Sequence, residues 1–280
     1  MLPSPPINEE FSYIAFEDSS ISCFDLSGVQ LIFSGQIKAN SRFQDQAVGF
    51  QADIYDHGIY EPNLFINVAR PFNNNRPKIS YLNISDIWWR HYSPSDQGVD
   101  VVGSCSLRIR VLWPAPDAFP SISNLKDLSQ FTEACFQVAA DPDEASEHFL
   151  YPKSKKELVL HDIKQRNWLQ ADHGSYSVDR EFSFYTPITK NHMLHLSFRP
   201  QGYWPQGTEP PEDTLNKVFV SFWDFMDKLS IIDEASQQTR TPGIELKGEM
   251  LERHLLEQEH TANTETANCW GDDDPDTSGW

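Results

Sequence analysis

The sequence contains no long apolar run and no recognisable export signal. None of its segments approaches the roughly 18 consecutive apolar residues that a membrane-spanning helix needs. The N-terminal residues MLPSPPINEE include neither the basic stretch nor the apolar stretch of a secretory signal. We therefore expect a cytoplasmic protein that makes no direct contact with a membrane and that begins with a flexible segment, residues 1–10.

Glycine is scarce, and the glycine-rich motifs of nucleotide chemistry are absent. With 13 glycines in 280 residues, the chain contains no P-loop and no G-x-G-x-x-G sequence. The nearest approach to the G-x-S-x-G motif of serine hydrolases is Gly103-Ser104-Cys105-Ser106-Leu107, which lacks the second glycine and leads into an expected strand. These absences argue against the nucleotide-binding and hydrolase families that such motifs mark.

Cysteine and metal-ligand patterns are also sparse. The four cysteines are scattered without a C-x-x-C pair: Cys23, Cys105, Cys135 and Cys269. This spacing is typical of reduced thiols in a cytosol rather than of a disulfide framework or a zinc site. His192 and His195 fall in an expected strand and point to opposite faces, so we expect one to be buried and the other exposed. The sequence predicts no metal and no cofactor.

Basic residues are few relative to acidic ones. The chain has 22 Lys and Arg against 41 Asp and Glu, for a formal net charge of -19. A field of this sign repels nucleic acid and anionic membranes, and it speeds association with a basic protein. We therefore expect no nucleic-acid partner, and we expect the partner to be another protein, a basic one.

The residues that are present suffice for a core, since 39% of them are hydrophobic and 12% aromatic. In residues 105–111, the apolar side chains of Cys105, Leu107, Ile109 and Val111 alternate with polar ones. A period of two with one polar face indicates half-buried strands of an antiparallel sheet. Further strands are expected at 29–37, 47–55, 63–69, 78–88, 157–161, 181–185 and 192–198.

Two segments have helical periodicity. The first, residues 123–139, has Ser123 as its expected N-cap. The second, residues 211–230, has acidic residues in its first turn and is apolar around most of its circumference, which indicates a helix that is largely covered. The fold class that follows is α+β, a largely antiparallel twisted sheet with two amphipathic helices packed on one face.

The chain divides into an α+β body, residues 11–232, and an acidic tail, residues 233–280. The order of strand, loop and helix occurs twice in the body, which suggests a duplicated unit with halves 11–141 and 144–232; chance similarity is the alternative. The tail holds twelve acidic and three basic residues, so we expect it to be largely disordered apart from a solvated helix at 244–259. It either docks on a basic partner or only adds solubility.

The segment Trp88-Trp89-Arg90-His91-Tyr92 is the most unusual local feature. Adjacent residues of a strand point to opposite faces, so one tryptophan can enter the core while the other stays at the surface. An exposed Trp beside Arg and Tyr has the composition of an interface hot spot, whereas the alternative is that both tryptophans fill the core or cover an edge. Trp270 and Trp280 in the tail are further candidates for partner contacts.

These observations rank three functions. The leading hypothesis is a non-enzymatic acidic protein-binding module that neutralises or escorts a basic partner, as immunity, chaperone and adaptor proteins do. The alternatives are a hydrolase whose His, Asp and Glu residues converge only in the fold, and a structural subunit of a larger assembly. A deep pocket with strongly shifted pKa values would favour the enzyme, a flat aromatic patch rimmed by acidic residues the binding module, and a broad apolar surface the subunit.

Overall fold

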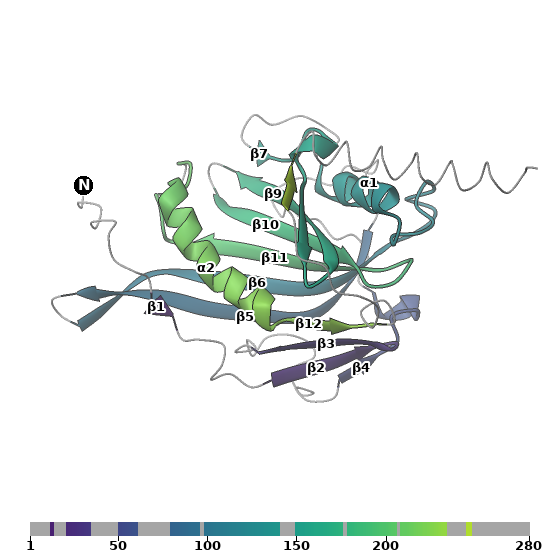
Figure 1. Cartoon of the computed structure of the whole chain (residues 1–280), viewed down its shortest axis with the longest axis horizontal. Coiled ribbons are helices and arrows are strands. Elements are labelled where there is room, and N and C mark those ends of the chain that lie inside the picture. The colour runs from purple at the N-terminus through teal and green to yellow at the C-terminus, as the bar shows by residue number, and fades with distance from the viewer. Residues whose placement is uncertain are drawn as a thin grey trace, which may run out of the picture.

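The computed structural model describes residues 12–13, 21–34, 50–60, 79–95, 98–140, 149–175, 178–205, 208–233 and 245–247. Over these residues the protein is an α+β structure of two α-helices, a large antiparallel sheet and a small mixed sheet, and most of it is strand (Figure 1). The expected fold class is confirmed at this level. The strand expected at 63–69 lies outside the described residues.

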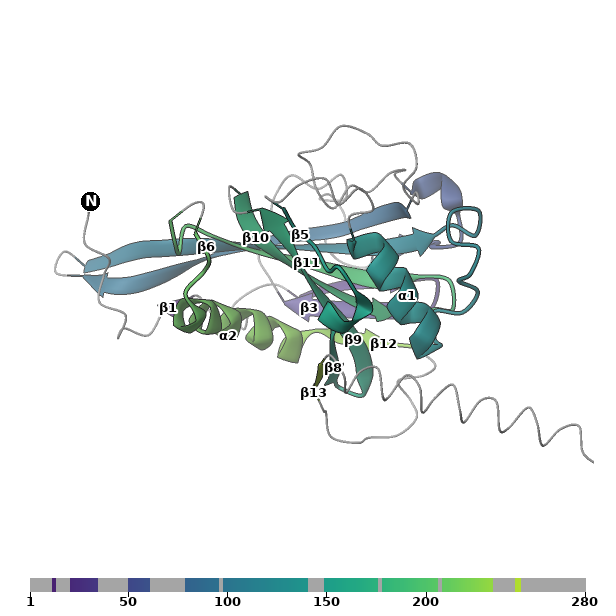
Figure 2. The ribbon, with the colours of Figure 1, turned by 90° about the horizontal axis from the view of Figure 1, so that it is seen from above.

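The large sheet is built around a hairpin of two long strands. β5 (Ile79–Ser95) pairs with β6 (Gly98–Pro114), which pairs on its other side with β11 (Met193–Gln201). The sheet continues through β10 (Val178–Pro187), β9 (Arg166–Ser175) and β8 (Val159–Ile163), and β1 (Ser12–Tyr13), β7 (Phe149–Leu150) and β13 (Glu245–Lys247) add short pairings to it. The β5–β6 hairpin extends beyond the other strands (Figures 1 and 2). Because β6 pairs with β11, strands from both expected halves share one sheet.

The small sheet has the order β12 (Ser230–Ile232), β3 (Val29–Ser34), β2 (Ile21–Leu26) and β4 (Phe50–Ala52). β4 runs parallel to β2, and the other pairs are antiparallel. The β2–β3 turn places Ser27 and Gly28 at φ values of 55° and 91°, as two-residue hairpin turns require. A short 3-10 helix, η3 (His57–Ile59), follows β4, and another, η4 (Lys155–Glu157), precedes β8.

The two α-helices pack on opposite faces of the large sheet, so the expectation of a single helical face was wrong. α2 (Glu212–Lys228) shares a core cluster with Leu107 and Ile109 of β6, whereas α1 (Leu128–Ala139) shares a second cluster with Leu112. Successive side chains of a strand point to opposite faces. The face that bears the polar residues of β6 becomes apolar at one end of the sheet, through Leu112 and Met193, and α1 covers that end.

The boundaries of the first helix also differ from the expectation. Its N-cap is Asp127, whose side chain accepts a hydrogen bond from the Gln130 N–H at 2.9 Å. Gln130 Oε1 reaches back to the backbone N–H groups of Ser123 and Asn124, at 2.7 and 3.0 Å. Ser123 therefore lies in a turn that precedes the helix. The polar groups of this turn satisfy one another, which is why the N-cap signal at Ser123 misplaces the helix start.

The second helix has the expected position, and the small sheet lies on its side of the molecule. Phe33 of β3 contacts Phe225 of α2 at 6.0 Å between ring centroids. In the tail, residues 245–247 form β13, which pairs with β8, where the sequence predicts part of a solvated helix at 244–259. The rest of that prediction concerns residues outside the described ranges.

Candidate binding surface

One side of α2 is at the surface, although the sequence predicts a largely covered helix. Val220 is 59% exposed and Trp223 is 37% exposed. Glu212, Asp213 and Asp227 are also exposed and belong to the same helix. The spacing of Asp213, Val220, Trp223 and Asp227 places them along one side of an α-helix. We call Glu212, Asp213, Val220, Trp223 and Asp227 the α2 surface.

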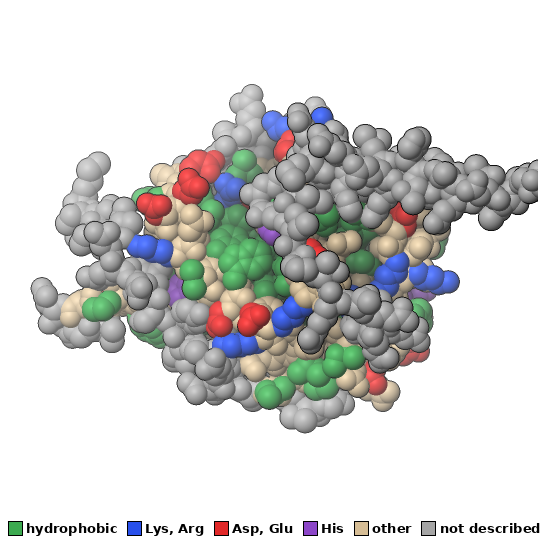
Figure 3. Space-filling model, viewed as in Figure 1, with side chains coloured by type: hydrophobic (Ala, Val, Ile, Leu, Met, Phe, Trp, Pro, Cys, Tyr) green, Lys and Arg blue, Asp and Glu red, His purple; other side chains and the backbone are tan. Residues whose placement is uncertain are grey.

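Aromatic and acidic side chains are segregated on this face of the molecule. Figure 3 shows hydrophobic side chains gathered near the centre of the view, with acidic side chains above and below them. Asp224, next to Trp223, pairs with Lys228 at 3.0 Å, whereas Glu212, Asp213 and Asp227 form no ion pair within the described residues. The arrangement is a small hydrophobic patch bordered by acidic side chains, with Lys and Arg side chains between them (Figure 3).

Rings from two strands and from α2 itself hold Trp223 in place. Its ring centroid lies 5.5 Å from that of His161 on β8 and 5.7 Å from that of Phe184 on β10. Phe219 and Phe222 of the same helix contact it at 6.0 and 5.1 Å. A side chain that is fixed before binding loses little further entropy in a complex. Trp223 is therefore a preorganised, partly exposed aromatic side chain.

The segment Trp88–Tyr92 is split between the two faces of β5. Trp89 is 6% exposed, stacks on Phe198 at 5.8 Å between ring centroids and is covered by α2. His91 is buried on the same face. Trp88 is half-buried on the opposite face, where the Arg90 guanidinium lies 4.7 Å from its ring centroid.

Only part of the predicted partner-binding set is therefore accessible. Trp89 and His91 are core residues, while Trp88, the exposed Arg90 and the half-buried Tyr92 are at the surface. A binding role for these three residues stays a prediction. Trp270 and Trp280 lie outside the described residues.

A partly buried chain of hydrogen bonds joins three residues that are remote in sequence. The Tyr203 hydroxyl lies 2.7 Å from His91 Nδ1 and 3.2 Å from Cys105 Sγ. Gly103 makes room for this arrangement, since a Cβ there would lie 2.7 Å from the Tyr203 ring. Sequence reasoning missed the chain because its members come from β5, β6 and the segment after β11.

The ionisation of this chain does not suit nucleophilic catalysis. Burial raises the pKa of the Cys105 thiol to about 12, although its hydrogen bonds with Tyr203 and Ser221 lower it in part. Burial also lowers the pKa of His91 to about 4. A reactive cysteine needs a lowered pKa, and its general base needs a pKa near the working pH. Cys105 and His91 are both held in their neutral forms. Their contacts with Tyr203 therefore have a structural role, which is to orient the tyrosine ring.

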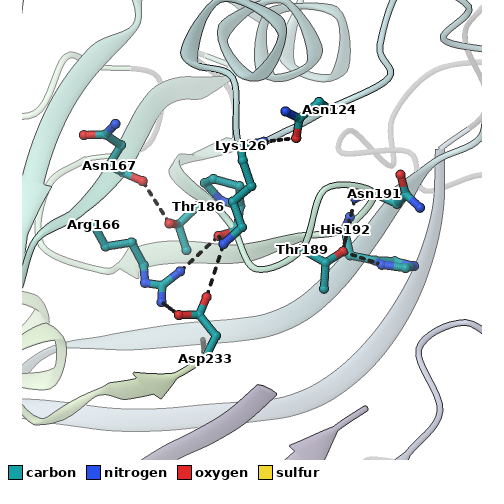
Figure 4. Close-up of polar contacts among 10 residues, drawn as sticks. Asn124, Lys126, Arg166, Asn167, Thr186, Thr189, Asn191, His192 and Asp233 are labelled. Carbon is teal, nitrogen blue, oxygen red and sulfur yellow. Dashed lines mark hydrogen bonds and ion pairs between the residues drawn. The ribbon is translucent and has the colours of Figure 1, made fainter. Parts of the chain in front are cut away.

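A second polar cluster joins the end of β12 to the body of the protein. Figure 4 shows Lys126 and Arg166 converging on Asp233, at 3.2 and 2.9 Å. Arg166 also donates to the Pro187 carbonyl at 3.0 Å. Asp233 is buried, so the residue at which the acidic tail was expected to begin is anchored in the folded body.

His192 and His195 are both buried, so the expectation that one of them is exposed was wrong. His192 lies 6.2 Å from Tyr60, on the side of the small sheet, and His195 stacks on Tyr185, which packs against α1. They do point to different faces, but both faces are covered. Among the described residues, no cluster of three or more His, Cys, Asp or Glu side chains could hold a metal ion. Within the same ranges, neither α-helix has the length and hydropathy to cross a bilayer.

Comparison with known proteins finds no significant match to this chain. No family model matches the chain, and neither a curated protein nor a solved structure matches it significantly.

Proposed function

We propose that this protein is a non-enzymatic protein-binding module that holds a basic partner protein against the α2 surface. The observation that carries the proposal is Trp223, which is 37% exposed, is held by four neighbouring rings and lies between acidic side chains of the same helix. Rigid aromatic side chains are typical anchors of protein interfaces. In this role the protein neutralises or escorts its partner in the cytoplasm, as immunity, chaperone and adaptor proteins do.

The charge of the chain supports a basic partner. Its formal net charge is -19, and Glu212, Asp213 and Asp227 place part of that charge beside the exposed aromatic residue. Charges at the rim of an interface accelerate encounter with a partner of opposite sign, and salt screens this effect. The association rate of the complex should therefore fall as ionic strength rises.

The pKa values of buried cysteine and histidine side chains favour a binding protein over a hydrolase. Cys105 and His91, which lie on one hydrogen-bonded chain with Tyr203, have pKa values moved away from those of a nucleophile and its base. The histidines His173 and His195 are likewise held neutral by burial, which lowers their pKa values. These shifts favour structural hydrogen bonding over proton transfer.

The test uses two matched surface substitutions. Peptides from a random displayed library are selected on the full chain, and we expect enrichment of sequences with net positive charge around an apolar residue. Binding of the selected peptides is then measured with Val220→Lys and with Val101→Lys. Val220 and Val101 are 59% and 53% exposed, so neither change disturbs the core, and Val101 is the register partner of Tyr92 on the other candidate surface.

The two variants separate the two surfaces. We expect Val220→Lys to raise the Kd of the selected peptides at least tenfold, and a tenfold change corresponds to about 1.4 kcal/mol. The Val101→Lys variant should bind the peptides as the wild type does. The reverse pattern would move the site to Trp88, Arg90 and Tyr92. Enrichment of acidic peptides, or binding that neither variant changes, would overturn the proposal.

A further inference from the structure

A row of four polar side chains crosses the face of the large sheet that lies away from α2. Asn83, Arg110, His195 and Tyr185 are consecutive register partners on β5, β6, β11 and β10. Each has a buried polar atom without a hydrogen-bond partner in the described structure, namely Asn83 Oδ1, Arg110 Nε, His195 Nδ1 and the Tyr185 hydroxyl. Cβ atoms of register partners lie about 5 Å apart, so Arg110 and His195, which are neighbours in the row, can reach one small ligand between them.

Arg110 is the charged member of this row and is buried. It is 7% exposed, and its guanidinium carbon lies 5.1 Å from the Tyr81 ring centroid. No carboxylate within the described residues forms an ion pair with it. Burial, with the nearby charge of Arg108, lowers the pKa of Arg110 to about 10. The guanidinium is thus still charged at neutral pH, and buried charges are normally paired because leaving them unpaired is costly.

The two carboxylates that act on Arg110 electrostatically are engaged elsewhere. Asp86 accepts a hydrogen bond from Arg108 Nε at 2.8 Å. Glu181 accepts one from the Ser197 hydroxyl at 2.6 Å and also pairs with Arg199. The positive charge of Arg110 is therefore available to a group that the chain itself does not supply.

His195, the register neighbour of Arg110, supplies a second donor. Its Nε2 lies 2.9 Å from the Ser183 hydroxyl, and its ring stacks on Tyr185 at 4.8 Å between centroids. When Ser183 donates to Nε2, the ring proton is on Nδ1, which is then a buried donor without a partner in the described structure. Burial, followed by the charges of Arg110, His173 and Arg108, lowers the pKa of His195, so the ring is neutral. Ser183 also approaches the Tyr185 hydroxyl, and its oxygen can accept from that phenol O–H while its own proton is donated to His195 Nε2.

We propose that Arg110 and His195 bind a small oxyanion, a carboxylate or a phosphate, that lies across this row. The guanidinium and the imidazole N–H are donors, and an ionised oxyanion is an acceptor only. Tyr81 supports the guanidinium plane from one side. Since the row and the α2 surface are on opposite faces of the sheet, binding of the oxyanion is independent of the proposed partner.

The test measures anion binding to the full chain directly. Inorganic phosphate and acetate are the probes, and chloride at matched ionic strength is the reference. We expect at least one probe to raise the melting temperature with the logarithm of its concentration, by about 5 °C at ~100 times its Kd, with a 1:1 calorimetric isotherm that saturates. A response to phosphate alone or to acetate alone identifies the class of ligand. A response to neither probe overturns the proposal.

Two matched variants assign the effect to Arg110. Arg110→Met keeps the volume of the side chain and removes its charge, and replacing a buried charge by an apolar group is commonly tolerated. Arg108→Gln changes a residue two positions away on the same strand that is already paired with Asp86. We expect the first variant to lose the anion response and the second to keep it. Anion stabilisation that persists in Arg110→Met overturns the proposal.

A measurement on the unaltered protein covers the case in which Arg110→Met fails to fold. The Nε–H resonance of Arg110 and the ring nitrogens of His195 are followed by NMR during titration with the same probes. Both should shift with one common saturation curve, because both groups contact one ligand. Saturable shifts elsewhere with neither of these resonances moving would show that the anion binds at another place.

Discussion

The indole nitrogen of Trp89 on β5 donates a hydrogen bond to the hydroxyl of Ser221 on α2 at 3.0 Å, and Ser221 donates in turn to the Val218 carbonyl at 2.9 Å. All three residues are buried. The contact joins a strand and a helix that are 132 positions apart in the chain. It satisfies a donor that would otherwise be stranded in an apolar core, where an unpaired polar group costs about 1–3 kcal/mol.

Ser221→Ala should lower the free energy of unfolding by about 1–2 kcal/mol, because the Trp89 N–H loses its acceptor. Urea unfolding monitored by tryptophan fluorescence measures the change. Val220→Ala is the control, since an exposed neighbour should change stability by no more than about 0.5 kcal/mol. A loss for Ser221→Ala as small as that of the control would show that another group accepts from Trp89.

Phe222→Ala should lower the free energy of unfolding by about 3–5 kcal/mol, the range for emptying a large aromatic site in a core. Phe222 is fully buried and stacks on Phe184 and Phe198 at 4.5 and 4.8 Å between ring centroids. Chemical denaturation provides the measurement. Trp223→Ala, whose side chain is partly exposed, should cost less than Phe222→Ala does. A loss below about 1 kcal/mol for Phe222→Ala would mean that the helix is peripheral.

Asp233→Asn should lower the free energy of unfolding by about 2 kcal/mol. The substitution removes the negative charge with which Arg166 and Lys126 each form an ion pair. The position also defines where the tail can be cut. A chain ending at residue 233 should melt at a higher temperature than a chain ending at residue 232, which lacks the Asp233 side chain. Equal melting temperatures for the chains ending at 232 and 233 would contradict a structural role for Asp233.

Acidification from pH 7 to pH 5 should destabilise the fold through its buried histidines. Burial lowers the pKa of His91 and of His192 to about 4, while the unfolded value is about 6.5. Between these values the unfolded chain binds more protons than the folded chain, so the free energy of unfolding falls as pH falls through this window. At about 1.4 kcal/mol per pKa unit, each histidine accounts for about 3 kcal/mol over the whole window.

Urea midpoints at pH 7, 6 and 5 measure this dependence. The double variant His91→Gln, His192→Gln should show a shallower slope than the wild type, because glutamine does not titrate. Carboxylates with lowered pKa values, such as Glu133, change stability only below about pH 4.5. Between pH 5 and 7 the pH dependence therefore comes from the histidines. An unchanged slope in the double variant would show that other groups cause the pH dependence.

Part of the fold could be predicted from the sequence, because backbone geometry sets the direction of successive side chains. Alternation at 105–111 predicts the strand that is now part of β6, and helical spacing at 211–230 predicts α2 within two residues at each end. The same local rule separates Trp88 from Trp89. In each case the pattern lies within one element, so it needs no knowledge of the partner that the element contacts.

The candidate site depended on contacts that no local pattern contains. Periodicity indicates that Phe222 and Trp223 lie on an apolar helix, but only the packing of Phe184 and His161 decides that Trp223 remains partly exposed. The polar side of β6 predicts a solvated face, yet Arg110 is buried there beside His195. Side-chain direction follows from neighbouring residues in the chain. Burial and pairing follow from strands and helices that are distant in sequence, and those contacts form only in the tertiary structure.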